Sequence, residues 1–219
     1  MKDIPADKAI PFMNWKEREK MKKLIISSMM LGLSVLCMPL VAADKKPLGK
    51  EESARVIEAA IRQEIKKPTG ELTKADLTKL VSLKVHRSTI TNLDALGGLV
   101  NIKVLDLFGN SDLRDITALR GLKNLERLTL YYPYPGSKAL KDITAIQGLT
   151  KLKSLNLQRC TNVSDVSALK GLTNLKSLNL SHTNISDVSA LKDLKNLEVL
   201  DIGYTKVNDV SALKDLKKL

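Results

Sequence analysis

The sequence has few aromatic residues and few cysteines, and these shortages limit what the protein can be. Phe, Trp and Tyr together make up 3% of the 219 residues, so the core must be built from aliphatic side chains. There are only two cysteines and two histidines. Zinc-type spacings, a glycine-rich phosphate loop and hydrolase motifs are missing as well. We therefore expect a non-enzymatic protein that uses no cofactor and no metal.

What the sequence does contain is a repeat of about 22 residues. Residues 178–199 read LNLSHTNISDVSALKDLKNLEV, and near copies open at Leu155 and Leu200. Repetition at a period of 20 to 50 residues indicates stacked structural units. Six units fit the pattern, and their strand positions are Leu83/Val85, Leu105/Leu107, Leu128/Leu130, Leu155/Leu157, Leu178/Leu180 and Leu200/Ile202.

Each unit predicts one strand and one tight turn. The L-x-L core alternates with a period of two, which predicts a short strand with Leu178 and Leu180 facing inward. Apolar residues then follow at steps of three, which predicts a tight helical turn on the opposite side. One unit cannot bury its own apolar side chains, so stacked units should share one core and one parallel sheet.

Two further positions recur once per repeat. An aspartate precedes the helical turn and is expected to cap it, not to act as an acid, a base or a calcium ligand. These aspartates are Asp115, Asp142, Asp165, Asp187 and Asp209. A small residue follows the strand, at Ser88, Asn110, Cys160, Thr183 and Thr205, and most of these can hydrogen-bond a neighbouring turn. Cys160 is therefore expected to be a structural thiol, and Pro133 breaks the pattern in the third repeat.

The repeats make the chain resemble bacterial leucine-rich-repeat proteins of the internalin-like, 22-residue class, from about Leu80 to Leu219. This resemblance implies an α/β repeat solenoid, a horseshoe with a parallel sheet on its concave face and short helical or 3-10 turns on its convex face. It implies a helical N-terminal cap over residues 44–79 and six repeats over 80–219, with no C-terminal cap. The resemblance is specific for the fold and does not identify a partner.

The expected cap has two helical segments. Glu51–Lys67 carries an apolar stripe of Ala54, Ile57, Ile61 and Ile65, which predicts an amphipathic helix that stops at Pro68-Thr69-Gly70. The spacing of Thr73 and Asp76 resembles a capping box for a second, short helix. Such a cap would cover the apolar end layer of the first repeat.

A single long apolar run lies near the amino terminus, where residues 24–43 carry no charge. Lys22 and Lys23 precede it and Val41-Ala42-Ala43 ends it, which predicts a signal peptide at residues 21–43. An uncleaved membrane anchor is the alternative, since a run of this length can span a bilayer. We expect cleavage and export to the periplasm, the cell surface or the medium, which leaves no stable membrane span.

Residues 1–20 precede the basic start of that signal. Because a signal begins at its basic region, we expect translation to start at Met21 and residues 1–20 to be a mis-assigned upstream extension. A start at Met1 is the alternative. A peptide from residues 1–20 in the unprocessed precursor would exclude the later start.

The outward-facing side chains of the strands predict a surface for a protein partner. Tyrosine and arginine often anchor interfaces, and the irregular third repeat adds a loop from Tyr131 to Leu140. The candidate contact residues are Lys84, Arg87, Phe108, Tyr131, Tyr132, Tyr134, Arg159, His182 and Tyr204.

Two other interaction modes remain open. Lys84, Arg87 and Arg159 favour an anionic polymer or glycan as the alternative ligand, which strong salt dependence would reveal. Self-association through the last repeat would appear as concentration-dependent sedimentation. The net charge of +12 is spread along the chain without a basic groove of stacked aromatics, so we expect no nucleic-acid binding. His86 and His182 lie about four repeats apart and are expected to be solvent-facing polar residues.

Overall fold

The structure is a computed structural model that describes residues 46–133 and 135–219. The chain divides into two compact units, and the second, Lys45–Leu219, contains all of the described residues. The predicted signal peptide and the segment before it therefore lie outside the described residues. Within residues 46–133 and 135–219, no helix is both long and apolar enough to cross a bilayer.

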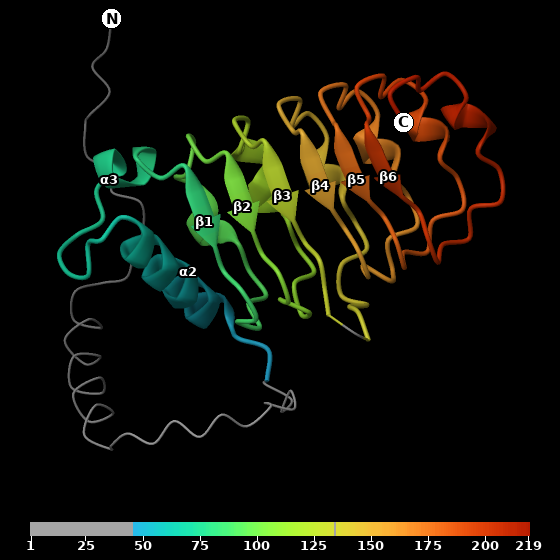
Figure 1. Cartoon of the computed structure of the whole chain (residues 1–219). Coiled ribbons are helices and arrows are strands. Elements are labelled where there is room, and N and C mark those ends of the chain that lie inside the picture. Colours follow the sequence, from blue (N-terminus) through green and yellow to red (C-terminus); the bar gives the residue numbers. More distant parts are fainter. Residues whose placement is uncertain (1–45, 134) are drawn as a thin grey trace, which may run out of the picture. The chain divides into compact units, whose positions relative to one another are not determined.

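Six short strands form one parallel sheet in sequence order (Figure 1). They are β1 (Ser82–Lys84), β2 (Val104–Asp106), β3 (Arg127–Thr129), β4 (Ser154–Asn156), β5 (Ser177–Asn179) and β6 (Val199–Asp201). Their central residues are aligned across the sheet: Leu83, Leu105, Leu128, Leu155, Leu178 and Leu200. The predicted strand positions and their common register are confirmed.

The return side of each repeat is a single turn of 3-10 helix, as the steps of three predict. These turns are η1 (Asp94–Leu96), η2 (Thr117–Gly121), η3 (Thr144–Ile146), η4 (Ser167–Leu169), η5 (Ser189–Leu191) and η6 (Ser211–Leu213). The core between sheet and turns is aliphatic, and its central leucines are 0–1% exposed from β1 to β5. Burial is lower in the sixth repeat, where Leu200 and Ile202 are only partly buried, because this layer has a neighbour on one side only.

The recurring aspartates bond the turns as predicted. Asp187 Oδ1 accepts the backbone N–H of Ser189, the first residue of η5, at 2.7 Å, and the other four aspartates accept the equivalent N–H at 2.7–2.8 Å. Each aspartate lies two residues before its donor, which is an Asx turn. These bonds hold the pKa values of Asp142, Asp187 and Asp209 below their usual range.

The small residues after the strands also hydrogen-bond backbone carbonyls. Asn110 Nδ2 donates to Val85 of the preceding repeat at 2.6 Å, and Cys160 Sγ contacts the Leu130 carbonyl at 3.4 Å. Thr183 instead closes its own turn by donating to Leu180 at 2.6 Å. Burial raises the pKa of the Cys160 thiol, which fits a structural role.

A second asparagine ladder, which sequence reasoning missed, precedes the strands. The side-chain amides of Asn101, Asn124, Asn174 and Asn196 donate to backbone carbonyls 23 or 24 residues earlier, at 2.9, 2.9, 2.8 and 2.9 Å. Lys151 takes this position in the fourth repeat, and its ammonium bonds Asn124 Oδ1 at 2.7 Å. The ladder ties each repeat to the one before it.

Two helices precede the first strand. Helix α2 (Lys50–Glu64) lies against β1 and η1, with Ile57 and Ile61 of its predicted stripe fully buried. It ends three residues before the predicted end, because Ile65 closes it and Lys66 takes a left-handed backbone with φ 55°. Helix α3 (Lys74–Thr78) begins at the predicted capping box of Thr73 and Asp76.

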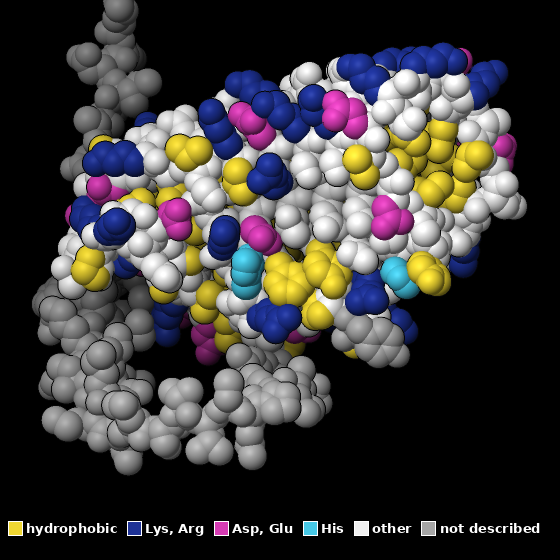
Figure 2. All heavy atoms as spheres, viewed as in Figure 1, with side chains coloured by type: hydrophobic (Ala, Val, Ile, Leu, Met, Phe, Trp, Pro, Cys, Tyr) yellow, Lys and Arg dark blue, Asp and Glu magenta, His cyan; other side chains and the backbone are white. Residues whose placement is uncertain are grey.

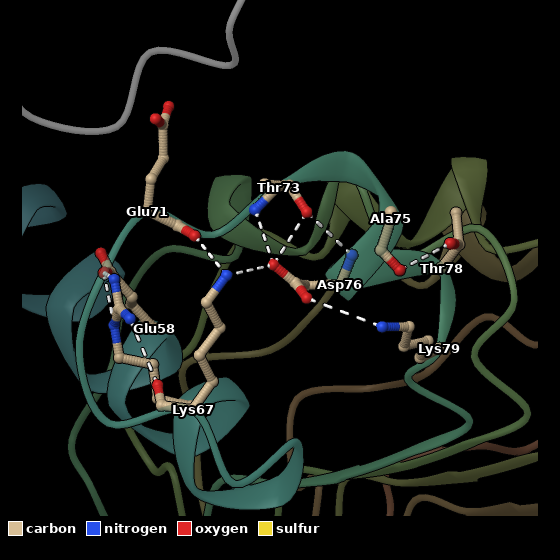
Figure 3. Close-up of polar contacts among 9 residues, drawn as sticks. Glu58, Lys67, Glu71, Thr73, Ala75, Asp76, Thr78 and Lys79 are labelled. Carbon is tan, nitrogen blue, oxygen red and sulfur yellow. Dashed lines mark hydrogen bonds and ion pairs between the residues drawn. The ribbon is translucent and has the colours of Figure 1, made fainter.

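The two helices are joined through the Asp76 carboxylate (Figure 3). Asp76 Oδ2 accepts hydrogen bonds from the Thr73 N–H at 3.0 Å and the Thr73 hydroxyl at 2.8 Å. The ammonium of Lys67, which follows α2, binds the same oxygen at 2.6 Å. These donors hold the pKa of Asp76 well below its usual range.

Candidate functional site

The side chains just beyond the carboxyl ends of the strands form one continuous edge of the repeats. We call it the aromatic rim and define it as His86, Arg87, Phe108, Tyr131, Arg159, His182 and Tyr204. Figure 2 shows its histidines and apolar side chains in one row along the lower edge of the sheet, with Lys and Arg side chains beside them. The rim contains most of the sequence-predicted contact residues.

The first part of the rim is a cluster of stacked rings over repeats 1 to 3. Phe108 stacks on Tyr131 with ring centroids 5.1 Å apart and contacts His86 edge-on at 5.7 Å. The Arg87 guanidinium lies over the same Phe108 ring, 4.9 Å from its centroid, which is a cation–π distance. His86 Nε2 is also 2.9 Å from Asp106 Oδ2. The cluster is thus ordered by its own contacts and remains partly exposed.

The second part of the rim lies over repeats 4 to 6. The His182 and Tyr204 rings are nearly parallel, with centroids 4.3 Å apart and planes 8° apart. Tyr204 is 83% exposed, so this pair presents a flat ring to solvent. Arg159 occupies the same repeat position next to His182.

A left-handed turn places these side chains on the rim. Arg159, His182 and Tyr204 have φ values of 59°, 57° and 57°, which residues other than glycine adopt uncommonly. Asx turns from Asn156, Asn179 and Asp201 precede them, with each Oδ1 accepting the N–H two residues later at 2.9 Å. Backbone bonds between adjacent repeats continue past the strands, as in His182 N to Gly203 O at 2.9 Å. The side chains therefore project from a fixed backbone.

The opposite rim, at the amino ends of the strands, has a different chemistry. Glu126 binds Lys153 at 2.7 Å and lies 3.8 Å from Lys103, and Lys176 binds Glu198 at 2.9 Å. These lysines hold the pKa values of Glu126 and Glu198 below their usual range. The amino-end rim thus carries Lys–Glu ion pairs between neighbouring repeats, whereas the aromatic rim carries rings and cations.

The expectation that Tyr132 faces the partner surface is wrong. Tyr132 is 0% exposed, and its hydroxyl has no hydrogen-bond partner among the described residues. The third repeat has Thr129 where the second, fourth, fifth and sixth repeats have an Asx residue, and the chain after Tyr132 bulges out before it rejoins the stack at Ser137, which pairs with Cys160. Tyr132 therefore turns inward and joins the hydrophobic core.

Other predicted contact residues are placed as follows. Lys84 is exposed on β1 and joins neither ring cluster, and Tyr134 lies outside the described residues. The sequence predicted a solvent-facing polar role for His86 and no contact role; the structure leaves its side chain exposed and places it beside Phe108. The sequence could have predicted this contact, because His86, Phe108 and Tyr131 occupy the equivalent position in three consecutive repeats. Two histidines four strands apart are separated by roughly 19 Å at the usual strand spacing.

The rim brings aromatic rings and guanidinium groups together on one surface. In residues 46–133 and 135–219, no three His, Cys, Asp or Glu side chains gather as a metal site would require. Planar rings beside guanidinium groups are the side chains that dominate the energetics of protein interfaces. The arrangement is therefore suited to binding another molecule on a rigid surface.

Comparisons with known proteins agree with this architecture. A family model described as leucine-rich repeats in two copies matches residues 173–215. A comparison with curated proteins found no match. The structure is similar to that of internalin C2 from Listeria monocytogenes, with a TM-score of 0.69 and 32% identity over 75% of this chain and 70% of that one.

A second internalin extends the comparison. Internalin F from the same organism has a TM-score of 0.63 and 27% identity, over 78% of this chain and 55% of that one. The chain therefore spans little more than half the length of internalin F. Taken with the repeat register, the 3-10 turns and the likeness to internalin C2, these comparisons show that the chain belongs to the internalin-like family of bacterial leucine-rich-repeat proteins.

Proposed function

We propose that this protein is an exported, non-catalytic module that binds a protein partner through the sheet face and the aromatic rim. The observation that carries this proposal is the distribution of aromatic residues. Four aromatic residues lie in the described part of the chain, and three of them, Phe108, Tyr131 and Tyr204, are at the rim. An aliphatic core does not need these rings, so their common location favours a role in contact.

The electrostatics support the same side of the molecule. On the opposite rim, Glu126 and Glu198 form ion pairs with lysines of neighbouring repeats. Exposed ion pairs of this kind contribute little free energy while they remain in water. The aromatic rim instead exposes apolar area, which gains free energy when a partner covers it.

Export is proposed from the sequence. The basic and apolar segment at residues 21–43 has the order of a signal peptide. Fractionation of cells that produce the full chain should place the mature protein outside the cytoplasm, with Asp44 as its first residue by N-terminal sequencing. A mature chain that keeps residues 21–43 would support the membrane-anchor alternative.

The binding proposal is tested with the full chain immobilised against envelope and extracellular fractions. The rim variant is Phe108→Ser, Tyr131→Ser and Tyr204→Ser. The matched control, Lys103→Ser, Lys153→Ser and Lys176→Ser, changes three exposed or partly exposed positions on the opposite rim. We expect a protein partner, identified by mass spectrometry, to be retained by the parent chain and the control and lost by the rim variant.

Other results would contradict the proposal. A partner that both variants retain would move the contact to another surface. If only acidic polysaccharide bound, with strong salt dependence, the polymer alternative predicted from Lys84, Arg87 and Arg159 would replace it.

A further inference from the structure

A hollow of about 440 Å³ lies beyond the carboxyl ends of the last three strands. Pro135 borders it from the third-repeat loop, and Arg159 and Thr161 from the fourth repeat. The fifth and sixth repeats contribute His182, Tyr204 and Lys206. Its size is within the range of sites that hold small ligands or a few side chains of a larger one.

The side chains of this hollow are held in place by the repeat. Arg159, His182 and Tyr204 occupy the same left-handed position in consecutive repeats. The equivalent residue is Gly109 in the second repeat and the buried Tyr132 in the third. A continuous row of large side chains at this position therefore exists only over β4, β5 and β6, where the hollow lies.

Charge distinguishes the hollow from the first ring cluster. Arg159 and Lys206 are the charged residues around it, and no Asp or Glu of the described chain lines it. In the first cluster, His86 faces Asp106 and Arg87 covers Phe108. The Lys206 ammonium makes no ion pair or hydrogen bond with the described residues.

The hollow also has one apolar wall. One face of the Tyr204 ring stacks on His182, and the ring is 83% exposed, so its other face is open to a ligand. A carboxylate near two cations gains charge-assisted hydrogen bonds, while an adjoining methylene or ring can stack on tyrosine. Acidic side chains on an extended segment combine these two features.

We propose that this hollow binds an acidic peptide segment of the protein partner, with a carboxylate held between Arg159 and Lys206 and the neighbouring apolar atoms on Tyr204. The proposal rests on the protein-binding function above and adds the chemistry of the bound segment. Since Tyr204 belongs to both the rim and the hollow, one partner can cover the rim and place an acidic side chain here.

The test is binding of the full chain to an array of random octapeptides, followed by titration of the strongest binders. The hollow variant is Arg159→Gln with Lys206→Gln, which removes both charges and keeps side-chain length. The control is Lys170→Gln with Lys192→Gln, which removes the same charge from exposed residues after η4 and η5. We expect the parent and the control to select peptides rich in Asp and Glu, and the hollow variant to bind them at least about tenfold more weakly.

Four results would overturn the proposal. The first is a parent chain that binds acidic and neutral peptides equally, and the second is a hollow variant that binds acidic peptides as tightly as the parent. Selective binding on a parallel array of uronate- and sialate-bearing glycans, with no peptide selected, would assign the hollow to an acidic sugar. A partner that the rim variant loses and the hollow variant keeps at full affinity would leave the protein-binding function intact and reject the acidic segment alone.

Discussion

At the scale of single residues, Tyr132 is the side chain that departs most from the repeat. It fills an aliphatic core with a phenol whose hydroxyl is buried without a partner among the described residues. Burial raises the pKa of this hydroxyl, so it stays neutral. An unsatisfied buried hydroxyl lowers the stability of the folded chain, whereas the ring raises it by filling volume in the core.

The opposite effects of the hydroxyl and the ring lead to a prediction for two variants of Tyr132. Tyr132→Phe removes only the hydroxyl and should stabilise the chain by roughly 1 kcal/mol, because a desolvated donor is lost. Tyr132→Ala should destabilise it by about 3–5 kcal/mol, because a large cavity opens. Urea unfolding followed by circular dichroism measures both. A Phe variant that is clearly less stable than the parent would show that the hydroxyl is bonded in solution.

Gly136 is a second residue whose identity follows from its surroundings. Its φ is 101°, and a Cβ built on it would lie 2.9 Å from the Arg159 carbonyl oxygen. Gly171 has φ 88° with open space around it, and Gly121 has open space without a positive φ. The three glycines therefore separate backbone strain from steric contact.

We predict a graded effect of alanine at these glycines. Gly136→Ala should be the most destabilising because strain and contact add, and Gly171→Ala should cost roughly 1–2 kcal/mol from strain alone. Gly121→Ala should be neutral or stabilise by up to about 1 kcal/mol, because the unfolded chain loses freedom. Thermal unfolding of the three variants gives the order, and equal shifts at Gly136 and Gly171 would exclude the contact with Arg159.

At the scale of elements, the cap depends on one carboxylate. Asp76 bonds the first turn of α3 and, through Lys67, the segment after α2, and its side chain is 16% exposed. These two links also affect the first repeat, because α2 covers it with Ile57 and Ile61. The exposed pair of Glu51 and Arg55, at 3.8 Å, serves as a comparison on the same helix.

We predict that Asp76→Ala speeds amide hydrogen exchange in residues 73–80 and in the last turn of α2. Asp76→Asn keeps an acceptor oxygen for Thr73 and loses the charge for Lys67, so its effect should be smaller. Glu51→Ala should leave exchange unchanged, because exposed pairs contribute little. Equal exchange in Asp76→Ala and the parent chain would show that Asp76 does not hold the cap.

The elements also show what a sequence can and cannot predict here. Strands and turns were predictable because Leu155 and Leu157 are spaced by the strand period, and the same pair recurs as Leu178 and Leu180 in the next repeat. The inward turn of Tyr132 was not, because it depends on a bulge that only this repeat has. The ring contacts of His86 and the hollow near Lys206 depend on how residues more than 20 positions apart meet, and no local pattern encodes ring angles or empty volume.

At the scale of the whole molecule, carboxylates in the cap and in several repeats link folding to the pH of the solution. Seven described carboxyl groups have pKa values below their usual range because of bonds to lysines or backbone N–H groups: Asp76, Asp94, Glu126, Asp142, Asp187, Glu198 and Asp209. The folded chain therefore binds fewer protons than the unfolded chain in mild acid. The resulting stabilisation is present above the unfolded pKa values near about 4 and is lost as the pH falls through the lower folded values.

We predict that the urea midpoint is constant from neutral pH to about pH 5 and falls steadily below about pH 4. The triple variant Asp142→Asn, Asp187→Asn and Asp209→Asn keeps an oxygen for each Asx turn and removes three titrating groups, so its midpoint should fall less steeply. Both proteins are compared at the same high salt concentration, which screens the repulsion of a basic chain. If their acid profiles coincide, the Asx aspartates do not couple folding to pH, and the remaining dependence belongs to the lysine-paired carboxylates of the cap and the amino-end rim.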